Sequence, residues 1–306
     1  MSKRLFRQEH PVLMGFILLG LVFLFFWGGV TFFISTVNRP AKGEIFGTKP
    51  GVGIIDLKGV ITTPEEIIDE LTSFRTNSNV KAIVLRIDSP GGAVGASQEI
   101  FEEVKRTNKV KPVVASMGSV AASGGFYAAL GAEKIVASAG TLTGSVGVIL
   151  KFANLKELFD KIGYKSEVVK SGDLKDIGSP DRPLSQKERD ILQALIDNVY
   201  NQFVKAVAES RNLPEEQVRA LADGRVFSGE QAKEAGLIDQ LGNFTDAIML
   251  AADLAGLDKE NPNLIYPEKK EFSIFEMLTG DSSQSILNRA AKPFSSILSY
   301  EWTLDH

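Results

Sequence analysis

The sequence predicts an α/β domain built on a largely parallel sheet. Segments rich in β-branched residues alternate with segments that carry helix-start signals, and this alternation indicates repeated strand–helix units. Val80–Ile87 reads VKAIVLRI, and so apolar a run is typical of a strand buried on both faces, as in a parallel sheet. With 306 residues, of which 44% are hydrophobic and 24% charged, the chain can bury a sizeable core.

The elements of this domain follow one another from residue 52 onward. Thr63 is the predicted N-cap of the first helix, because Pro64 suits the first helical position and Glu66 completes a capping box. That helix is expected to end near Phe74. Strands are expected at 52–60, 80–87, 112–116, 134–137 and 166–169, and further helices at 96–107, 123–131, 154–162, 214–222, 228–235 and 244–255.

One long helix carries an apolar stripe. A capping box from Ser185 to Glu188 predicts where it begins, and it is expected to run to about Arg211. The helical spacing of the stripe indicates packing in the core or against another subunit rather than a site. Its members are Ile191, Leu192, Leu195, Ile196, Val199, Tyr200, Phe203 and Val207.

The N-terminal region predicts a membrane anchor. Val12–Ile34 contains 23 residues without a charge, enough to cross about 30 Å of hydrocarbon as a helix at about 1.5 Å per residue. Three basic residues and one acidic residue precede it. By the positive-inside rule, the N-terminus then stays in the cytoplasm and the rest of the chain faces outward. A cleaved signal peptide is the alternative, but the apolar run is long and no A-x-A site follows it.

The chain is therefore expected to have five parts. They are a cytoplasmic N-terminus (1–11), a single-pass transmembrane signal anchor (12–34), a linker (35–50), the α/β domain (51–256) and a variable C-terminal extension (257–306). The extension mixes apolar and polar residues without a clear period from Lys269 onward, which suggests an ordered tail or a short helix.

Composition excludes several classes of function. The formal net charge of −4 argues against a nucleic-acid partner. The chain has no cysteine, and its two histidines, His10 and His306, lie at its ends. Neither a disulfide nor a transition-metal site is therefore expected, and we predict no metal and no cofactor. A serine nucleophile in the domain would need a lysine or a carboxylate as its base.

Ser123 is the candidate nucleophile. It stands at the predicted start of a helix, where unpaired backbone N–H groups and the helix dipole favour an alkoxide and a developing oxyanion. Gly124 and Gly125 follow and would let a substrate backbone approach closely. The alternative is an ordinary N-cap serine before a helix of small residues, and the local pattern alone favours that alternative.

Two further clusters of glycine and hydroxyl residues are candidates. Asp88–Gly92 (DSPGG) follows a buried strand, at the edge where ligands of α/β sheets bind. Its glycine N–H groups could form an oxyanion hole, or the segment could be a plain strand-to-helix turn. Ser145, within Thr143–Gly147, could hydrogen-bond a neutral amine, or it could belong to a structural turn.

The candidate bases are lysines between residues 150 and 180: Lys151, Lys165, Lys170 and Lys175. Lys175 is favoured because its segment contains glycine and proline, as active-site loops often do. Its pKa must fall well below the usual lysine value, and burial in an apolar pocket can lower it. Asp173 and Asp176 would oppose this change, so their side chains should point elsewhere. The alternative for each lysine is a solvated surface charge.

Together these segments resemble the signal peptide peptidase A family of membrane-anchored Ser-Lys proteases. The resemblance covers about residues 50–245 and the N-terminal anchor. It rests on five blocks in order: Asp88–Gly92, Ser116–Tyr127 (SMGSVAASGGFY), Leu142–Gly147 (LTGSVG), Lys170–Pro180 (KSGDLKDIGSP), and Asp223–Ala232 (DGRVFSGEQA) with Gly236–Asp239 (GLID).

The resemblance implies a role for each matching residue. Ser123 would be the nucleophile, Lys175 the general base, and Ser145 the residue that orients the lysine. The N–H groups of Gly91 and Gly124 would form the oxyanion hole. It also implies a fold like the βα spiral of ClpP and crotonase, and a homo-oligomer in which serine and lysine meet across a subunit boundary.

The function implied is that of a serine endopeptidase that degrades cleaved signal peptides and other apolar polypeptides. It would act at the bacterial cytoplasmic (inner) membrane, held to lipid by residues 12–34, with its catalytic domain outside the cytoplasm. A related quality-control or regulatory protease of the envelope is the main alternative. A crotonase-type hydratase or isomerase and an inactive scaffold are less favoured, because neither needs the serine and lysine blocks.

Overall fold

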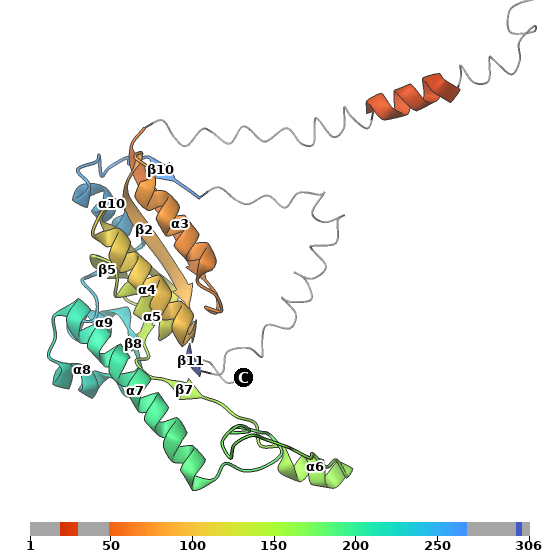
Figure 1. Ribbon diagram of the computed structural model, residues 1–306. Helices are drawn as coiled ribbons and strands as arrows, with labels where there is room; N and C mark the ends of the chain where they lie inside the picture. Colours follow the sequence, from red (N-terminus) through yellow and green to blue (C-terminus); the bar gives the residue numbers. More distant parts are fainter. Residues whose placement is uncertain (1–18, 30–48, 268–297, 302–306) are drawn as a thin grey trace, which may run out of the picture. The chain divides into compact units, whose positions relative to one another are not determined.

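The computed structural model describes residues 19–29, 49–267 and 298–301 (Figure 1). The chain forms two compact units, Met1–Phe46 and Gly47–His306. In the first unit residues 19–29 are helical, and the large apolar side chains of this helix are exposed. In the described part of the chain, no helix is both long and apolar enough to span a bilayer. Residues 12–18 and 30–34 of the predicted anchor, 12–34, lie outside the described residues.

The second unit is an α/β domain with a largely parallel central sheet, as the sequence predicts. The strands along its main path run in the order β10-β1-β2-β4-β5-β9, and each neighbouring pair is parallel. Their bounds are β1 (Gly51–Lys58), β2 (Val80–Ser89), β4 (Val113–Ala122), β5 (Lys134–Ala137), β9 (Gln240–Leu241) and β10 (Leu264–Ile265).

β4 is longer than the predicted strand 112–116. Its last residues pair in parallel with β6 (Leu142–Gly144), and β6 pairs antiparallel with β8 (Val226–Ser228). We call β6 and β8 the side branch of the sheet. The pairing of β4 with β6 continues to Ala122, the residue before Ser123. The pairing of β4 with β6 therefore brings the segments around Ser123 and Ser145 together.

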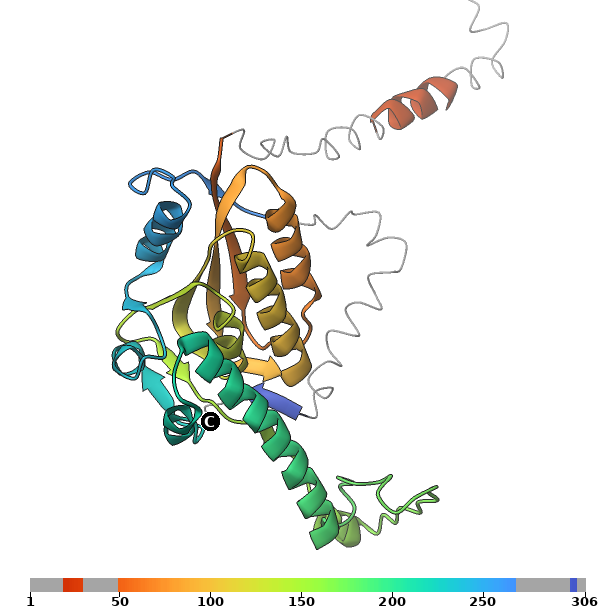
Figure 2. The ribbon, with the colours of Figure 1, turned by 60° about the vertical axis from the view of Figure 1, so that its left-hand side comes forward.

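Helices cover both faces of the sheet (Figures 1 and 2). On β1, Val52 and Ile54 pack in the cluster that includes α10 (Phe244–Leu254), while Gly53 between them faces Phe74 of α3 (Glu65–Thr76). Successive residues of a strand point to opposite faces, so α3 and α10 lie on opposite sides of the sheet. α4 (Val94–Asn108) packs beside α3 and against α5 (Gly124–Ala129).

Two predictions are wrong, one of a helix cap and one of a strand. α3 has Pro64 itself as N-cap, and proline has no side-chain oxygen to accept a bond, so the capping box from Thr63 does not form. The predicted strand 166–169 is absent: those residues are irregular and exposed, because no strand lies beside them to complete a ladder. The capping box of Ser185 and Glu188 is confirmed, and α7 spans Gln186–Arg211.

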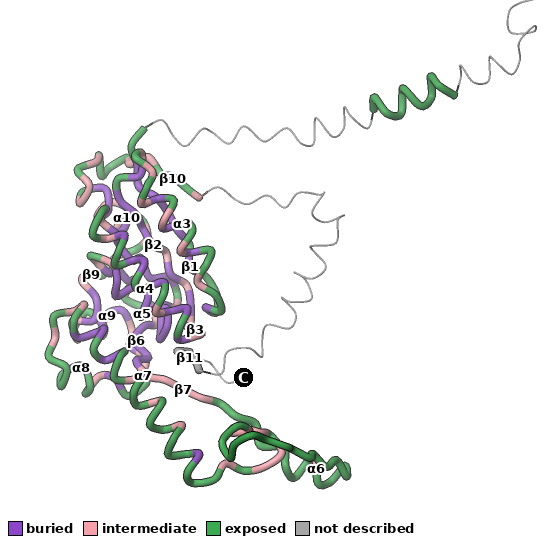
Figure 3. Tube along the Cα trace, in the orientation of Figure 1, coloured by how far each residue is buried: buried purple, intermediate pink, exposed green. Residues whose placement is uncertain are grey.

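The two halves of α7 have different surroundings. Phe203 and Val207 in its C-terminal half are buried, whereas Ile191 and Leu195 in its N-terminal half are 42% and 45% exposed. Residues 151–184, which we call the arm, connect β7 (Ile149–Leu150) to α7 and contain α6 (Lys156–Ile162). No residue of the arm is buried (Figure 3). The apolar stripe of α7 is therefore core in one half and surface in the other.

A second, small sheet was not predicted. β11 (Leu298–Glu301) lies antiparallel between β3 (Gly91–Ala93) and β7. It belongs to the extension for which the sequence suggested an ordered tail or a short helix, and the rest of that tail falls outside the described residues. α8 (Glu215–Leu221) and α9 (Gly229–Glu234) complete the domain.

Truncation of Phe203 should test how α7 is anchored. Phe203 is fully buried and its ring centroid lies 4.8 Å from that of Tyr127 in α5. We expect Phe203→Ala to lower the free energy of unfolding by about 3–5 kcal/mol. Ile191→Ala, on the exposed half of the same helix, should cost less than about 1 kcal/mol. Urea denaturation at low protein concentration measures both, and equal losses would contradict the packing described.

Candidate active site

Ser123 lies at a sharp turn between β4 and α5 and has a strained backbone. Its φ is 53° and its ψ is −116°, a conformation that costs a residue with a Cβ atom about 1–3 kcal/mol. Two hydrogen bonds hold it: the Ser123 N–H donates to Gly144 O at 2.8 Å, and the Tyr127 N–H donates to Ser123 O at 2.8 Å. The Ser123 side chain makes no capping bond. Ser123 thus occupies the N-cap position of α5 but does not cap the helix with its side chain, as an ordinary N-cap serine does.

Ser145 has a strained backbone as well, with a φ of 51°. Its N–H donates to Arg225 O at 2.8 Å, beside the antiparallel pair of β6 and β8. Among the described residues, the other non-glycine residue with positive φ is Asn212, which has the left-handed conformation usual after a helix end. Ser123 and Ser145 have no such explanation, and both line the same pocket. Strain of this kind tends to occur at functional sites.

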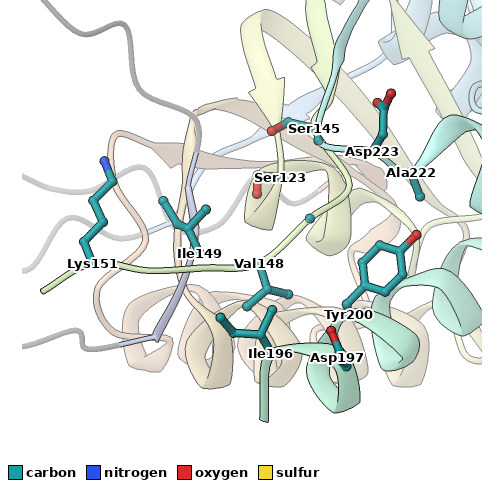
Figure 4. Close-up of a pocket in the computed structure, with 12 residues that line it drawn as sticks. Ser123, Ser145, Val148, Ile149, Lys151, Ile196, Asp197, Tyr200, Ala222 and Asp223 are labelled. Carbon is teal, nitrogen blue, oxygen red and sulfur yellow. The ribbon is translucent and has the colours of Figure 1, made fainter. Parts of the chain in front are cut away.

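This pocket has a volume of about 550 Å³ and mixed walls (Figure 4). Val148, Ile149 and Ile196 supply apolar surface near the Ser123 hydroxyl. Polar groups come from Asp197, Tyr200 and Asp223. Arg225 hydrogen-bonds the Asp223 carboxylate and lowers its pKa to about 2, so Asp223 is ionised at neutral pH.

Most of these pocket walls were not predicted from the sequence. Ile196, Asp197 and Tyr200 are on α7, and Ala222 and Asp223 precede β8, far along the chain from Ser123. Ile196 and Tyr200 belong to the apolar stripe of α7, which is visible in the sequence. It was assigned to packing, because helical spacing alone does not distinguish a pocket wall from a core.

Gly91 and Gly124 are close together, as the proposed oxyanion hole requires. A Cβ on Gly124 would lie 2.4 Å from Ser97 Oγ and 3.2 Å from both Gly91 Cα and Gly92 N. The Gly91 N–H donates to Ser89 Oγ at 3.1 Å. That N–H would have to leave the Ser89 hydroxyl to bind an oxyanion, so the roles of Gly91 and Gly124 stay predictions.

The structure does not bring Lys175 to Ser123 within one subunit. Lys175 is exposed on the arm, where it lines a hollow with Asp173 and Lys187 that is separate from the pocket of Ser123. Lys151 does line the pocket of Ser123, but its side chain points away from the serine (Figure 4).

The other two candidate lysines also lie on the arm. Lys165 is exposed, and Lys170 Nζ donates to Asp176 Oδ1 at 2.7 Å.

Of the two aspartates whose side chains were expected to point elsewhere, Asp173 lines the same hollow as Lys175. Asp176 is instead paired with other side chains. Its carboxylate accepts hydrogen bonds from Lys170 and from Arg182. The hydrogen bond from Arg182, and after it the one from Lys170, hold the pKa of Asp176 below its usual range.

No group of His, Cys, Asp and Glu that could hold a metal ion is found in the described part of the chain.

Fold and pocket together are those of an α/β serine protease, and comparison with known families agrees. The chain belongs to peptidase family S49, whose family model matches residues 105–258, half of the chain. The Clp protease family model matches residues 53–141 and supports the predicted ClpP-like α/β fold. The predicted signal peptide peptidase A family is confirmed. A crotonase-type hydratase and an inactive scaffold are thereby set aside.

Individual relatives differ in length from this chain. A candidate protease of Synechocystis sp. is 45% identical over 239 residues, which are 78% of this chain and 86% of that protein. The chloroplastic serine protease SPPA of Arabidopsis thaliana is 35% identical over 253 residues, which are 80% of this chain and 37% of the relative. A candidate signal peptide peptidase SppA of Enterococcus faecium is 38% identical over 185 residues.

The chain thus spans most of the first relative, 37% of the second and 54% of the third. Among solved structures, it is similar to a ClpP1 mutant from Listeria monocytogenes with a TM-score of 0.43 and 19% identity. That match covers 64% of this chain and 94% of the other.

A methyl group on Gly124 should disturb the site and leave the fold intact. It would press on Ser97 Oγ and on the backbone of Gly91 and Gly92, and a displacement of about 1 Å can cost roughly a hundredfold in rate. We expect Gly124→Ala to lose about that factor in kcat for peptide cleavage. Gly95→Ala is the control, because nothing lies within 4 Å of a Cβ there. Full activity of Gly124→Ala would contradict a role for this close contact.

Proposed function

We propose that this chain cleaves peptide bonds with a Ser123–Lys175 dyad. The observation that carries the proposal is the pair of strained serines, Ser123 and Ser145, that line one pocket. A strained strand-to-helix turn presents a nucleophilic serine in other hydrolases, because it exposes the hydroxyl and brings backbone N–H groups close to it. The domain between residues 49 and 267 contains no histidine, so the base must be another residue.

The proposed reaction has two stages. Lys175, in its neutral form, takes the proton of the Ser123 hydroxyl while Ser123 Oγ bonds to the carbonyl carbon of the substrate. The N–H groups of Gly91 and Gly124 stabilise the oxyanion that forms. Lys175 then gives its proton to the leaving amine as the peptide C–N bond breaks. The lysine then takes a proton from water as the water oxygen bonds to the acyl carbon. It returns this proton to Ser123 Oγ as the ester bond breaks and the acid product leaves.

We propose that Lys175 reaches Ser123 from a neighbouring subunit. The arm carries Lys175 outside the core of its own subunit, and the N-terminal half of α7 leaves apolar surface beside it. Both features fit burial against a second copy of the chain. Such burial would take Lys175 out of water and lower its pKa, as a general base needs. Ser145 would accept or donate a hydrogen bond at the lysine amine and orient it.

The small sheet supports an extended polypeptide as substrate. β11 adds a strand between β3, which contains Gly91, and β7, which leads into the pocket wall. A substrate could pair with the same two edges, since strand addition needs only backbone hydrogen bonds and leaves side-chain pockets to select residues. The apolar wall of Val148, Ile149 and Ile196 would accept an apolar side chain.

Signal peptides are apolar, and one drawn out of the bilayer as an extended chain would fit this description. We therefore propose that the protease degrades them at the bacterial cytoplasmic membrane, with residues 12–34 as a single-pass anchor and the catalytic domain outside the cytoplasm. The enzyme would need no metal and no cofactor. Other envelope polypeptides with apolar segments would fit the same groove, as in a quality-control or regulatory protease.

Mixing two inactive variants should test the shared site. We expect Ser123→Ala and Lys175→Ala each to lose at least about a thousandfold in kcat. If serine and lysine come from different subunits, co-assembly in equal amounts should restore about a quarter of wild-type activity, because that fraction of sites pairs the two intact residues. Peptide cleavage after co-expression measures this. No recovery would contradict a site shared between subunits.

The pH dependence separates the base from other lysines. A lysine must lose its proton to act, so kcat/KM should rise with pH through the pKa of Lys175. Lys165→Ala, another exposed lysine of the arm, is the control and should keep both the rate and the profile. An unchanged rising limb in Lys175→Ala would show that another group is the base.

Deletion of residues 268–306 should free the strand position between β3 and β7. We expect KM for a peptide substrate to fall several-fold with little change in kcat, because β11 no longer competes for the same edges. A shorter deletion, of residues 302–306, keeps β11 and serves as the control. An unchanged KM would contradict pairing of the substrate at this position.

A further inference from the structure

Arg182 joins the loop that carries Lys175 to the start of α7. Its Nε and Nη2 atoms donate to the two carboxylate oxygens of Asp176, at 3.2 and 2.9 Å. Its Nη1 and Nη2 atoms donate to the two carboxylate oxygens of Glu188, at 2.9 and 2.6 Å. One guanidinium therefore makes bidentate contacts with two carboxylates, a geometry that lysine cannot reproduce.

The Glu188 end of this bridge is fixed. The Glu188 side chain is 3% exposed and closes the capping box of α7. It accepts hydrogen bonds from the Ser185 N–H at 2.8 Å and the Ser185 hydroxyl at 2.9 Å. The contacts with Arg182 and Ser185 hold the pKa of Glu188 at about 2. Arg182 is thus anchored to the first turn of a long helix.

The Asp176 end reaches the residue next to Lys175. Between Gly163 and Leu184 the arm forms neither helix nor strand, so its shape depends on side-chain contacts and turns. The Lys175 N–H donates to Gly172 O at 3.1 Å, and the Ser179 N–H donates to Asp176 O at 3.0 Å. These short turns fix Lys175 relative to Asp176, and the Leu155 N–H donates to Pro180 O at 2.7 Å within the arm. Arg182 adds the connection from this loop to α7.

We propose that Arg182 is a positioning residue for Lys175, which ties its loop to α7 and compensates the charge of Asp176. This inference rests on the proposed role of Lys175 as the general base. Arg182 itself does not line the pocket of Ser123, so it acts through the lysine.

Charge balance around Lys175 explains why the compensation matters. Arg182 and Lys170 pair with Asp176 and Glu188, so these four charges sum to zero. Asp173 of the loop and Lys187 of α7 also face the hollow of Lys175, and they too are opposite in sign. Without Arg182 one negative charge would be uncompensated, and it would raise the pKa of Lys175. Without the Asp176 charge, one positive charge would remain and lower it.

The test is the pH dependence of kcat/KM in the full-length protein with an apolar peptide substrate. We expect Arg182→Gln to move the rising limb to higher pH and Asp176→Asn to move it to lower pH, each by about half a pH unit. The double variant should return close to the wild-type profile. Arg189→Gln, which removes a cation of α7 that makes no ion pair in the described structure, is the matched control and should leave the limb in place.

Opposite shifts are the decisive readout. A merely structural role would lower the rate in both variants without moving the limb in opposite directions. If Arg182→Gln unfolds, as thermal melting would reveal, the downward shift in Asp176→Asn carries the test alone. No shift in Asp176→Asn overturns the inference while the dyad proposal stands, provided that Lys175→Ala abolishes the limb. A rising limb of the pH profile that persists in Lys175→Ala overturns both this inference and the dyad proposal.

Discussion

The site depends on a backbone conformation that Ser123 does not adopt by preference. A left-handed φ at a residue with a side chain persists only where the surrounding structure determines it from several sides. Here the pairing of β4 with β6 runs up to Ala122, and the Ser123 N–H donates to Gly144 on the partner strand. The Thr143 hydroxyl donates to Ala121 O at 2.7 Å, which fastens the same two strands by a side chain. The strain at Ser123 is therefore stabilised by a sheet, not by the loop that contains it.

The same side branch of the sheet fixes Ser145. Gly144 has a φ of 77°, and a Cβ there would lie 2.5 Å from the Phe227 ring of β8. Only glycine permits this close approach, and it lets β8 cover β6 while the Ser145 N–H donates to Arg225 O. Through the pairing of β8 with β6, the block from Asp223 to Ala232 thus supports the part of the pocket that contains Ser145. Gly236–Asp239 has a structural role of another kind, because Asp239 accepts from the Ile135 N–H at 2.7 Å and from Arg211 at 2.9 Å.

The elements predicted correctly from the sequence are those that short-range interactions determine. β2, β5 and α7 could be predicted within about two residues because apolar runs and a capping box are short-range features. Ser123 could be selected as a candidate from the sequence, but its backbone strain could not be predicted. That strain depends on pairing with a strand some twenty residues later in the chain. β11 was missed because pairing with β3 and β7 joins segments far apart in the sequence. The strand predicted at 166–169 failed for the opposite reason: its β-branched residues have no ladder to join within the subunit.

The two halves of the proposed dyad are placed on elements of opposite character. Ser123 is 1% exposed and is held by the core, whereas Lys175 is exposed on an arm without buried residues. A lysine in water keeps its proton near neutral pH and is no base. Burial would release that proton, and in the assembly we propose it is a second copy that buries the arm. Assembly would then create the base and deliver it to the serine in one event. An isolated subunit would carry a serine without a base, which protects other polypeptides from it before assembly is complete.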